Sequence, residues 1–565
     1  MMRRALLVAG CVLAGGAVLP GSSWAAQPES RADALRIVRA IPVQHQGRLK
    51  PFDSFAREVL DAITGRPQLG SEDPVASVLS MIAEPEPWQR KALIEVPFVP
   101  LRELLGMDRR ATHISYDELV ATRRLMRQLP AIVEKQQRDE KLTLLENETM
   151  DAFQRFVTFN GLIEQRLALI PPPPGSVEVI WRQISPSADG GPAPQHAAAR
   201  ASWQALLEAW RAGNAQQAAQ AAARLADQLA ALNPAAQPAR WRLRLELTYN
   251  AAQPFRAAQW CYLFAALALA ANLSARSRRA RPAGLWLLVG AFAVHAAGIA
   301  ARVVLGGRPP VSNFFETMLW LPFVGVLLAL VFERIYLPAP HHRMVAGQAG
   351  RAGYFGLAAS ILAAITLLLA DFVPLDSSIA PVVAVLRSNL WLTIHVLTIV
   401  ASYGALALAT VLAHLYGVQF LIRRPGRAAT RALDLFLYRT IQVGVVLLAG
   451  GIMLGAVWAN ASWGRYWGWD PKETWALITL LWYLALLHGR FAGWIRGVWV
   501  AVGTILGFYL LLITYYGVSF YLVGLHSYAG GHAKPLPPLL LAYLIAESAF
   551  LLVLSLSALR RQRLV

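Results

Sequence analysis

Hydrophobic and polar positions divide the chain into two parts with different patterns. Through residues 27–255, apolar residues recur at helical spacing among polar and charged ones, which is typical of amphipathic helices. From about residue 257 onward, long apolar runs alternate with short basic clusters, and each run can cross a hydrocarbon core of about 30 Å. The pattern predicts an all-α polytopic membrane protein, with a mainly helical domain at residues 27–255 followed by a transmembrane domain at residues 256–565.

The N-terminal part carries local helix signals and no recognisable catalytic motif. Ser115 and Glu118 have the spacing of a capping box before an amphipathic stretch. Four consecutive prolines at residues 171–174 interrupt the helical pattern, which an alanine-rich segment later resumes. Three isolated histidines lie in polar surroundings, and we interpret them as surface residues: His45, His113 and His196.

The C-terminal part contains nine apolar runs of transmembrane length. They begin near Ala258, Ala283, Thr317, Tyr354, Trp391, Leu437, Thr474, Gly497 and Pro537. Basic residues cluster in alternate gaps between the runs, and such clusters favour the cytoplasmic side. The clusters fall at residues 276–281, 333–343, 423–431, 490–496 and 560–563. The intervening gaps are therefore predicted to face outward, at residues 306–316, 371–389, 460–473 and 526–534.

The first residues have the order of a secretory signal. Arg3 and Arg4 precede an apolar stretch at residues 5–18, and Ser23-Trp24-Ala25 supplies small residues at a cleavage position. As a helix this stretch rises only ~21 Å, less than a full membrane crossing. Residues 1–26 are thus predicted to be a signal peptide, with an uncleaved anchor as the alternative. Either way, we expect the domain that follows to be exported, which predicts a chain in the bacterial inner membrane with its N-terminal domain in the periplasm.

Composition supports a membrane protein and excludes several other classes. The 565 residues are 56% hydrophobic and 15% charged, with a mean hydropathy of +0.41. The net charge of +19 follows the basic clusters between apolar runs, and no zinc-finger spacing or single-strand-binding motif accompanies it, so nucleic acid is not an expected partner. Cys11 and Cys261 are the two cysteines, which excludes a disulfide framework and a cysteine-ligated cluster. The chain also lacks Cys-x-x-Cys-His, so it is not itself a c-type cytochrome.

The outward gap before the seventh run is rich in tryptophan. It carries four indoles within thirteen residues, interleaved with glycines and an Asp-Pro-Lys-Glu insert: Trp463, Trp467, Trp469 and Trp475. An interfacial aromatic belt is one interpretation, because tryptophan is enriched where bilayer meets water. A belt requires neither glycine turns nor a charged insert, however. The segment therefore favours a flat, π-faced platform for a planar macrocycle.

Histidines lie at matching positions around this loop. His395 opens the fifth run from the outside, and His526 follows the eighth, so both are expected at the depth of the tryptophans. His488 lies fourteen residues into the seventh run, inside the hydrocarbon. Intramembrane histidines are costly unless paired or ligating, although each alone is compatible with helix packing. Two of them flanking an aromatic loop favour ligation of haem iron.

The segment Trp463–Thr479, WGRYWGWDPKETWALIT, closely resembles the tryptophan-rich WWD signature of the CcsA/ResC family. That family supplies the haem-handling half of the system II cytochrome c synthetase. The flanking segments LHGR and GLHSYA resemble the family as well, as does RPPVSNFFE before the third run. PVQHQGRLKPFDS, from residue 42, looks like the exported extension of longer members.

The resemblance implies a set of haem ligands. His395 and His526 would be the axial pair of a non-covalent haem b held over the WWD loop, which also includes Asp470. His488 would bind a second haem within the membrane, and the family usually takes the other ligand from a CcsB/ResB partner. No ResB-like half is recognised in the sequence, so His295 is a local candidate for that ligand. Helix rise places His295 ~18 Å and His488 ~9 Å above the inner face, which favours the external ligand. For His414 we favour a packing role.

The function implied is system II cytochrome c maturation. The protein would carry haem to the outer face of the membrane and present it for covalent attachment to Cys-x-x-Cys-His of apocytochrome c, as a subunit of a holocytochrome c synthase without acid–base catalytic residues. Three cations are candidates for the haem propionates: Arg387, Arg465 and Lys472. Asp470 is as well suited to capping the seventh helix as to contacting ligand. The alternatives are a haem exporter without ligation activity, a system I WWD protein and, last, a structural scaffold.

Overall fold

The computed structural model of the chain describes residues 30–176, 179–185, 194–275, 279–336, 353–373, 375–381, 389–422, 427–526 and 536–563. Within these residues the chain forms two compact units. The first runs from residue 30 to Ala252 and takes in Ser378–Pro381, and the second begins at Gln253 and contains the rest. The predicted signal segment, residues 1–26, lies outside the described residues.

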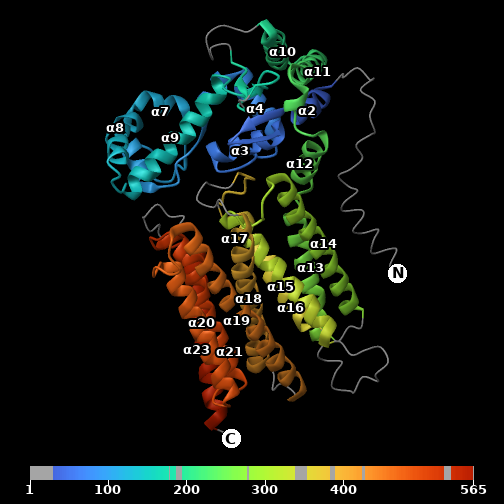
Figure 1. Cartoon of the computed structure of the whole chain (residues 1–565), viewed down its shortest axis with the longest axis vertical. Coiled ribbons are helices and arrows are strands. Elements are labelled where there is room, and N and C mark those ends of the chain that lie inside the picture. The colour runs from blue at the N-terminus through green and yellow to red at the C-terminus, as the bar shows by residue number, and fades with distance from the viewer. Residues whose placement is uncertain are drawn as a thin grey trace. The chain divides into compact units, whose positions relative to one another are not determined.

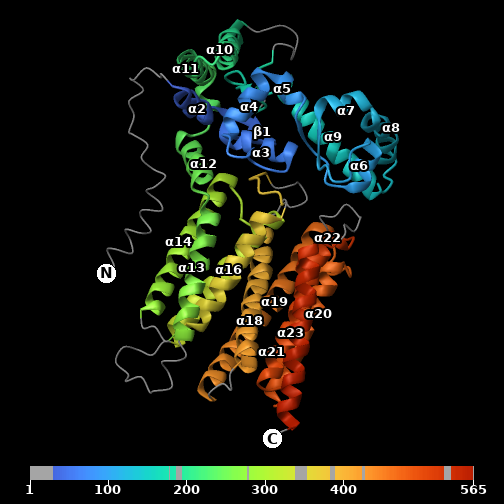
Figure 2. The same cartoon turned by 180° about the vertical axis from the view of Figure 1, so that it is seen from behind.

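The first unit is mainly helical, as predicted, but also contains two small sheets (Figures 1 and 2). Its helices are α2 (Arg31–Ala40), α3 (Phe52–Thr64), α4 (Pro74–Ala83), α5 (Pro85–Gln89), α6 (Val99–Leu105), α7 (Tyr116–Thr122), α8 (Arg124–Gln137), α9 (Leu144–Ile163), α10 (Pro194–Arg211), α11 (Ala215–Leu232), the 3-10 helix η1 (Pro234–Ala236) and α12 (Arg240–Ala252). One antiparallel sheet has the order β2-β1-β5-β6, from β1 (Pro42–His45), β2 (Arg48–Pro51), β5 (Ala168–Ile170) and β6 (Arg182–Gln183). The other pairs β3 (Ala92–Glu95) with β4 (His113–Ser115).

The predicted capping box is confirmed, because the Ser115 side chain accepts from the Glu118 N–H and the Glu118 carboxylate accepts from the Ser115 N–H. The surface interpretation is wrong for His196, which is 6% exposed on α10. His45 lies 3.3 Å from the Glu58 carboxylate, and Nε2 of His113 lies 3.1 Å from the Thr64 carbonyl oxygen. His196 is therefore buried in this unit, and His45 and His113 each have a polar partner within it.

The second unit is a bundle with helices at all nine predicted positions. They are α13 (Pro254–Ala275), α14 (Ala280–Gly306), α15 (Phe314–Tyr336), α16 (Tyr354–Phe372), α17-η4-α18 (Asn389–Ile422), α19 (Arg427–Trp463), α20 (Pro471–Phe491), α21-η5-α22 (Val498–Tyr521) and α23 (Pro538–Arg563). Seven of them are long and apolar enough to cross a membrane by length and composition, and α13 and α20 are the two outside that set. The chain is thus an all-α polytopic membrane protein.

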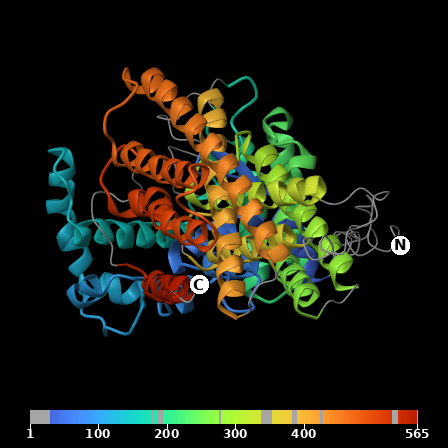
Figure 3. The same ribbon diagram turned by 90° about the horizontal axis from the view of Figure 1, so that it is seen from below.

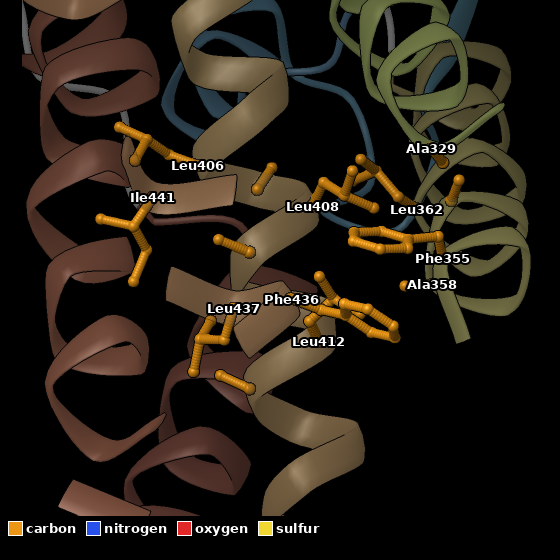
Figure 4. Close-up of a cluster of buried hydrophobic side chains, with 14 of the residues drawn as sticks. Ala329, Phe355, Ala358, Leu362, Leu406, Leu408, Leu412, Phe436, Leu437 and Ile441 are labelled. Atoms are coloured by element: carbon orange, nitrogen blue, oxygen red, sulfur yellow. The ribbon is translucent and has the colours of Figure 1, made fainter. Parts of the chain in front are cut away.

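Helix α18 forms the centre of the bundle. It packs against α15, α16, α19, α21 and α23. In the view of Figure 3, α13–α16 lie on one side of it and α20–α23 on the other. Figure 4 shows the apolar contacts in the core, made by Ala329, Phe355, Ala358, Leu362, Leu406, Leu408, Leu412, Phe436, Leu437 and Ile441. A Cβ at Gly404 of α18 would clash with the Leu321 carbonyl oxygen of α15, so glycine permits the close approach of these two helices.

Candidate functional site

His395 lies in a π-helical segment, η4 (Leu392–Val396), at the start of the α18 helix. Such segments are frequent at functional sites because they change the direction of side chains within a helix. The imidazole Nδ1 is 2.9 Å from the Gly451 carbonyl oxygen of α19. A carbonyl oxygen only accepts, so Nδ1 carries the proton and the lone pair of neutral His395 is on Nε2. This is the nitrogen that can ligate iron.

The sequence of α19 makes room for this ring. A Cβ at Gly455 would lie 2.7 Å from Cε1 of His395, closer than any side chain tolerates. Gly451, one turn earlier, supplies the carbonyl that fixes the imidazole. Two glycines four residues apart on one helix face thus bring His395 against the α19 backbone.

His526 is fixed in the same way by a carboxylate. Its Nδ1 lies 2.9 Å from Oδ1 of Asp470 and donates to it, which leaves Nε2 with the lone pair. Oδ2 of Asp470 accepts from the Leu525 N–H at 2.7 Å, and Oδ1 also accepts from the Lys472 N–H that begins α20. Asp470 therefore caps α20, as one of its two predicted roles required, and also orients His526. Its contact with a ligand stays a prediction.

The environment of Asp470 keeps it ionised. Burial raises the pKa of its carboxyl, but hydrogen bonds from His526 and from the backbone N–H groups of Lys472 and Leu525 outweigh burial and leave the pKa below its ordinary value. A carboxylate hydrogen-bonded to the outer nitrogen of a histidine increases the basicity of the other nitrogen. The pair thus favours ligation through Nε2 of His526.

The two histidines meet the same aromatic cluster. The ring centroid of Trp458, near the end of α19, lies 6.0 Å from that of His395, and the two ring planes are nearly parallel at 15°. It lies 6.2 Å from the ring centroid of His526. Trp463 lies 4.9 Å from Trp458 and 5.8 Å from His526, edge-on to both. We did not predict Trp458, which precedes the WWD loop. Its spacing from Gly451 and Gly455 could have indicated it, because this spacing places all three residues on one face of α19.

The other tryptophans of the loop have separate contacts. Trp467 and Trp469 form a T-shaped pair with centroids 5.8 Å apart, and Trp469 is 70% exposed with a φ of 58°. Trp475 lies in the first turns of α20, where its carbonyl accepts from the hydroxyls of Thr479 and Thr514. The four indoles predicted to form one platform therefore lie in three places: Trp463 beside Trp458, Trp467 paired with Trp469, and Trp475 on α20.

The candidate propionate cations have different surroundings. Arg465 lies 5.9 Å from the Trp463 ring centroid, and its guanidinium is 3.8 Å from the Glu473 carboxylate. The Lys472 ammonium donates to the Tyr515 carbonyl at 3.3 Å and to the Ser519 hydroxyl at 3.1 Å, which ties the start of α20 to η5 (Ile513–Gly517) and α22 (Val518–Tyr521). Arg387 lies outside the described residues.

His488 and His295 have contrasting environments. His488 is exposed on α20, and its Nδ1 lies 2.8 Å from the Leu484 carbonyl oxygen, so Nε2 again carries the lone pair. His295 on α14 is completely buried, 3.3 Å from the Tyr262 hydroxyl and packed against the rings of Phe255 and Phe323. These contacts do not bring His295 to His488.

His414 has a polar partner in addition to its packing contact. Its Nε2 lies 2.9 Å from a carboxylate oxygen of Glu547 on α23, and its ring stacks on Phe550 with centroids 5.2 Å apart. We did not predict Glu547, because no spacing rule joins two residues on helices this distant in the chain. The pair links α18 to α23, which fits the structural role expected of His414.

Fold and site together define a multi-pass membrane protein with a histidine–tryptophan site at one end of its bundle. The four site segments are the start of the α18 helix, the end of α19, the start of α20 and the segment after α22, which meet at the same end. Residues 311–526, ending at His526, match the family described as "Cytochrome C assembly protein".

Curated relatives agree with this family. The chain is 34% identical to the cytochrome c biogenesis protein CcsA of Guillardia theta over 41% of this chain and 80% of that protein. It is 35% identical to CcsA of Synechococcus sp. (strain CC9902) over 45% of this chain and 88% of that protein. Protein NrfI of Wolinella succinogenes is 30% identical over 87% of this chain, which spans about half, 54%, of NrfI. The chain belongs to the CcsA family of cytochrome c assembly proteins.

Proposed function

We propose that this protein takes part in cytochrome c biogenesis by holding haem on the outer face of a bacterial inner membrane and presenting it to apocytochrome c. The observation that carries the proposal is the pair formed by His395 and His526. Each has its Nδ1 proton directed to a fixed acceptor and its Nε2 lone pair available, and both contact Trp458. Haem is the substrate of this proposal, and membership of the CcsA family supports haem delivery as the protein's role.

The residues fit a bis-histidine haem. Two neutral imidazoles give iron a closed coordination sphere, which limits its reaction with oxygen during handling. The indoles of Trp458 and Trp463 supply an apolar wall beside both histidines. An incoming Cys-x-x-Cys-His segment would then replace one histidine and bring its thiols beside the vinyl groups, so positioning supplies the rate increase without a protein acid or base.

The test of the proposal is the spectrum of the detergent-purified protein. We expect non-covalent b-type haem with low-spin, bis-histidine bands in the wild type. His395→Ala and His526→Ala should abolish maturation of a reporter cytochrome c, with partial rescue by added imidazole. His532→Ala, six residues beyond His526, is the sequence-matched control and should retain activity. A haem-free preparation that still matures cytochrome c with its partner present would contradict the proposal.

Ligation must be distinguished from export alone. Reconstitution with apocytochrome c in a host that lacks its own maturation systems separates the two. Covalent haem on the apocytochrome supports a synthase subunit, whereas haem reaching the outer face without thioether bonds supports the exporter alternative. A CcsB/ResB-like protein is the proposed partner and must be supplied in both arms.

A second haem site is proposed at His488. The exposed position of this side chain on α20 and the available Nε2 support a ligand from outside this chain. A histidine of the CcsB/ResB partner fits this geometry better than His295, whose ring is enclosed by α13, α14 and α15.

The N-terminal unit is proposed to lie in the periplasm.

A further inference from the structure

Trp458 has a buried donor for which the described residues offer no acceptor. Its side chain is 6% exposed, and its indole Nε1 is buried without a hydrogen-bond partner anywhere in the described residues. Leaving a buried donor unsatisfied costs free energy, and most such groups in folded proteins find a partner. The N–H of Trp320, by comparison, donates to the Leu397 carbonyl at 3.1 Å.

The position of this donor connects it to the haem site. The Trp458 ring contacts both proposed ligands, His395 and His526, while their own Nδ1 protons are directed elsewhere. The guanidinium of Arg465 faces Trp463. Its buried Nη1 has no hydrogen bond within the described residues, although it lies 3.8 Å from the Glu473 carboxylate. Trp463 in turn is 4.9 Å from Trp458. One unsatisfied N–H, that of Trp458, and one cation, Arg465, thus lie beside the pair of Trp458 and Trp463.

We infer that Trp458 is a specificity-determining residue, whose indole N–H donates a hydrogen bond to a carboxylate of the bound porphyrin. The inference rests on the proposed function and deepens it. Carboxylate is the acceptor that the cargo brings, since a porphyrin with propionates carries anionic oxygen at its edge while its remaining rim is apolar. Arg465 would supply the charge, and Trp458 a neutral, fixed donor. The ring of Trp458 contacts the two histidines, and its N–H distinguishes a macrocycle with carboxylates from one without them.

The experiment compares two iron porphyrins that differ in the carboxylates. Haem carries two propionates, whereas iron octaethylporphyrin has the same ring and axial chemistry with no carboxylate. Binding of each to detergent-purified protein with its partner is followed by the Soret band. Trp458→Phe should weaken haem binding roughly ten-fold to a hundred-fold, the range for a hydrogen bond to a charged group, and leave iron octaethylporphyrin within about two-fold. Trp320→Phe is the matched control, because the N–H it removes already has an acceptor; it should leave the ratio of the two affinities unchanged.

A second variant separates the N–H from the ring. Replacement of Trp458 by β-(3-benzothienyl)alanine keeps the bicyclic shape and substitutes sulfur for N–H, so it tests the donor even if Trp458→Phe fails to fold. It should reproduce the selective loss of haem binding. Equal loss of both porphyrins would assign Trp458 to packing alone and overturn the inference, as would no loss of either. If the wild type binds iron octaethylporphyrin and haem with equal affinity, the carboxylate contact is also refuted while the haem site stands. A wild type that binds neither porphyrin refutes the proposed function itself, and the inference with it.

Discussion

At the scale of single residues, the site depends on hydrogen bonds that settle which nitrogen of each histidine is free. The carbonyl of Gly451 and the carboxylate of Asp470 each accept a hydrogen bond from an Nδ1–H, so both lone pairs are on Nε2. The sequence predicted His395 and His526 from their positions beside the tryptophan loop. It could not predict their acceptors, because Gly451 is 56 positions from His395 and Asp470 is 56 positions from His526.

Asp470→Asn tests the orientation of His526 apart from the helix cap. Asparagine caps helices about as well as aspartate, so α20 should keep its N-terminus, whereas the negative charge beside the imidazole is lost. Loss of such an outer-shell carboxylate typically lowers metal affinity 10–100-fold, and we expect haem retention to fall in that range. Asp470→Ala should lose about 1 kcal/mol more stability than Asp470→Asn, because it also removes the cap. Thermal unfolding and haem content of the two variants provide the measurement; equal haem retention in wild type and Asp470→Asn would contradict the role.

The same carboxylate gives a pH dependence of defined sign. Because folding lowers the pKa of Asp470, its contribution to stability is fully present above the unfolded value, about 3.9, and is lost as pH falls through the lower folded pKa. Unfolding midpoints of wild type and Asp470→Asn should therefore converge as the medium is acidified below about pH 4. A constant difference across that range would show that the ionised carboxylate is not the stabilising form.

Gly455→Ala tests the packing of His395 on α19. The added Cβ would lie 2.7 Å from the imidazole and must displace it from the Gly451 carbonyl. We expect loss of the low-spin spectrum, since the axial ligand moves. Gly450→Ala on the same helix is the control, because a Cβ there meets nothing within 4 Å. Identical spectra for both variants would show that His395 does not ligate from this position.

At the scale of elements, hydropathy predicted a helix at each of the nine apolar positions, because an apolar run of this length satisfies its backbone only as a helix. The π-helical segments η4 and η5 could not be predicted, since one shifted hydrogen-bond register leaves no mark in composition. The hairpin of β1 and β2 was also missed. Its strands have four residues each, and β1 pairs with β5 more than a hundred positions later.

His488, on the exposed face of α20, allows a test of the proposed membrane-embedded haem site. His488→Ala should remove one of two haem signals when the protein is purified with the proposed CcsB/ResB-like partner, and should leave the proposed His395/His526 haem in place. His295→Ala should not change the haem spectrum, because its ring packs within α13–α15; it should lower the thermal unfolding temperature instead. Unchanged haem loading and maturation in His488→Ala would exclude a membrane-embedded site on this chain.

At the scale of the whole molecule, basic clusters alternate along the sequence, and the site segments meet at one end of the bundle. The start of the α18 helix, the end of α19 and the start of α20 belong together only if successive helices run in opposite directions. The basic clusters predict the same alternation, because they favour the cytoplasmic side. Sequence therefore predicted which loops share a face, whereas the contacts of Trp458 needed the packing of α19 against η4.

Reporter fusions test this topology directly. Because basic clusters favour the cytoplasm, each fusion that follows one should report cytoplasm, and each fusion in an intervening gap should report the outside. The measurement is paired alkaline phosphatase and green fluorescent protein activity, where the phosphatase is active outside and the fluorophore forms inside. Cytoplasmic signals are expected after Arg281, Val345, Arg427 and Arg561, and outward signals after Gly307, Ser377, Ser462 and Gly531. A fusion after Ala252, the end of the N-terminal unit, should also report the outside. One reversed pair would change the number of crossings before α20, and with it the side of the membrane on which Trp463 and His526 lie.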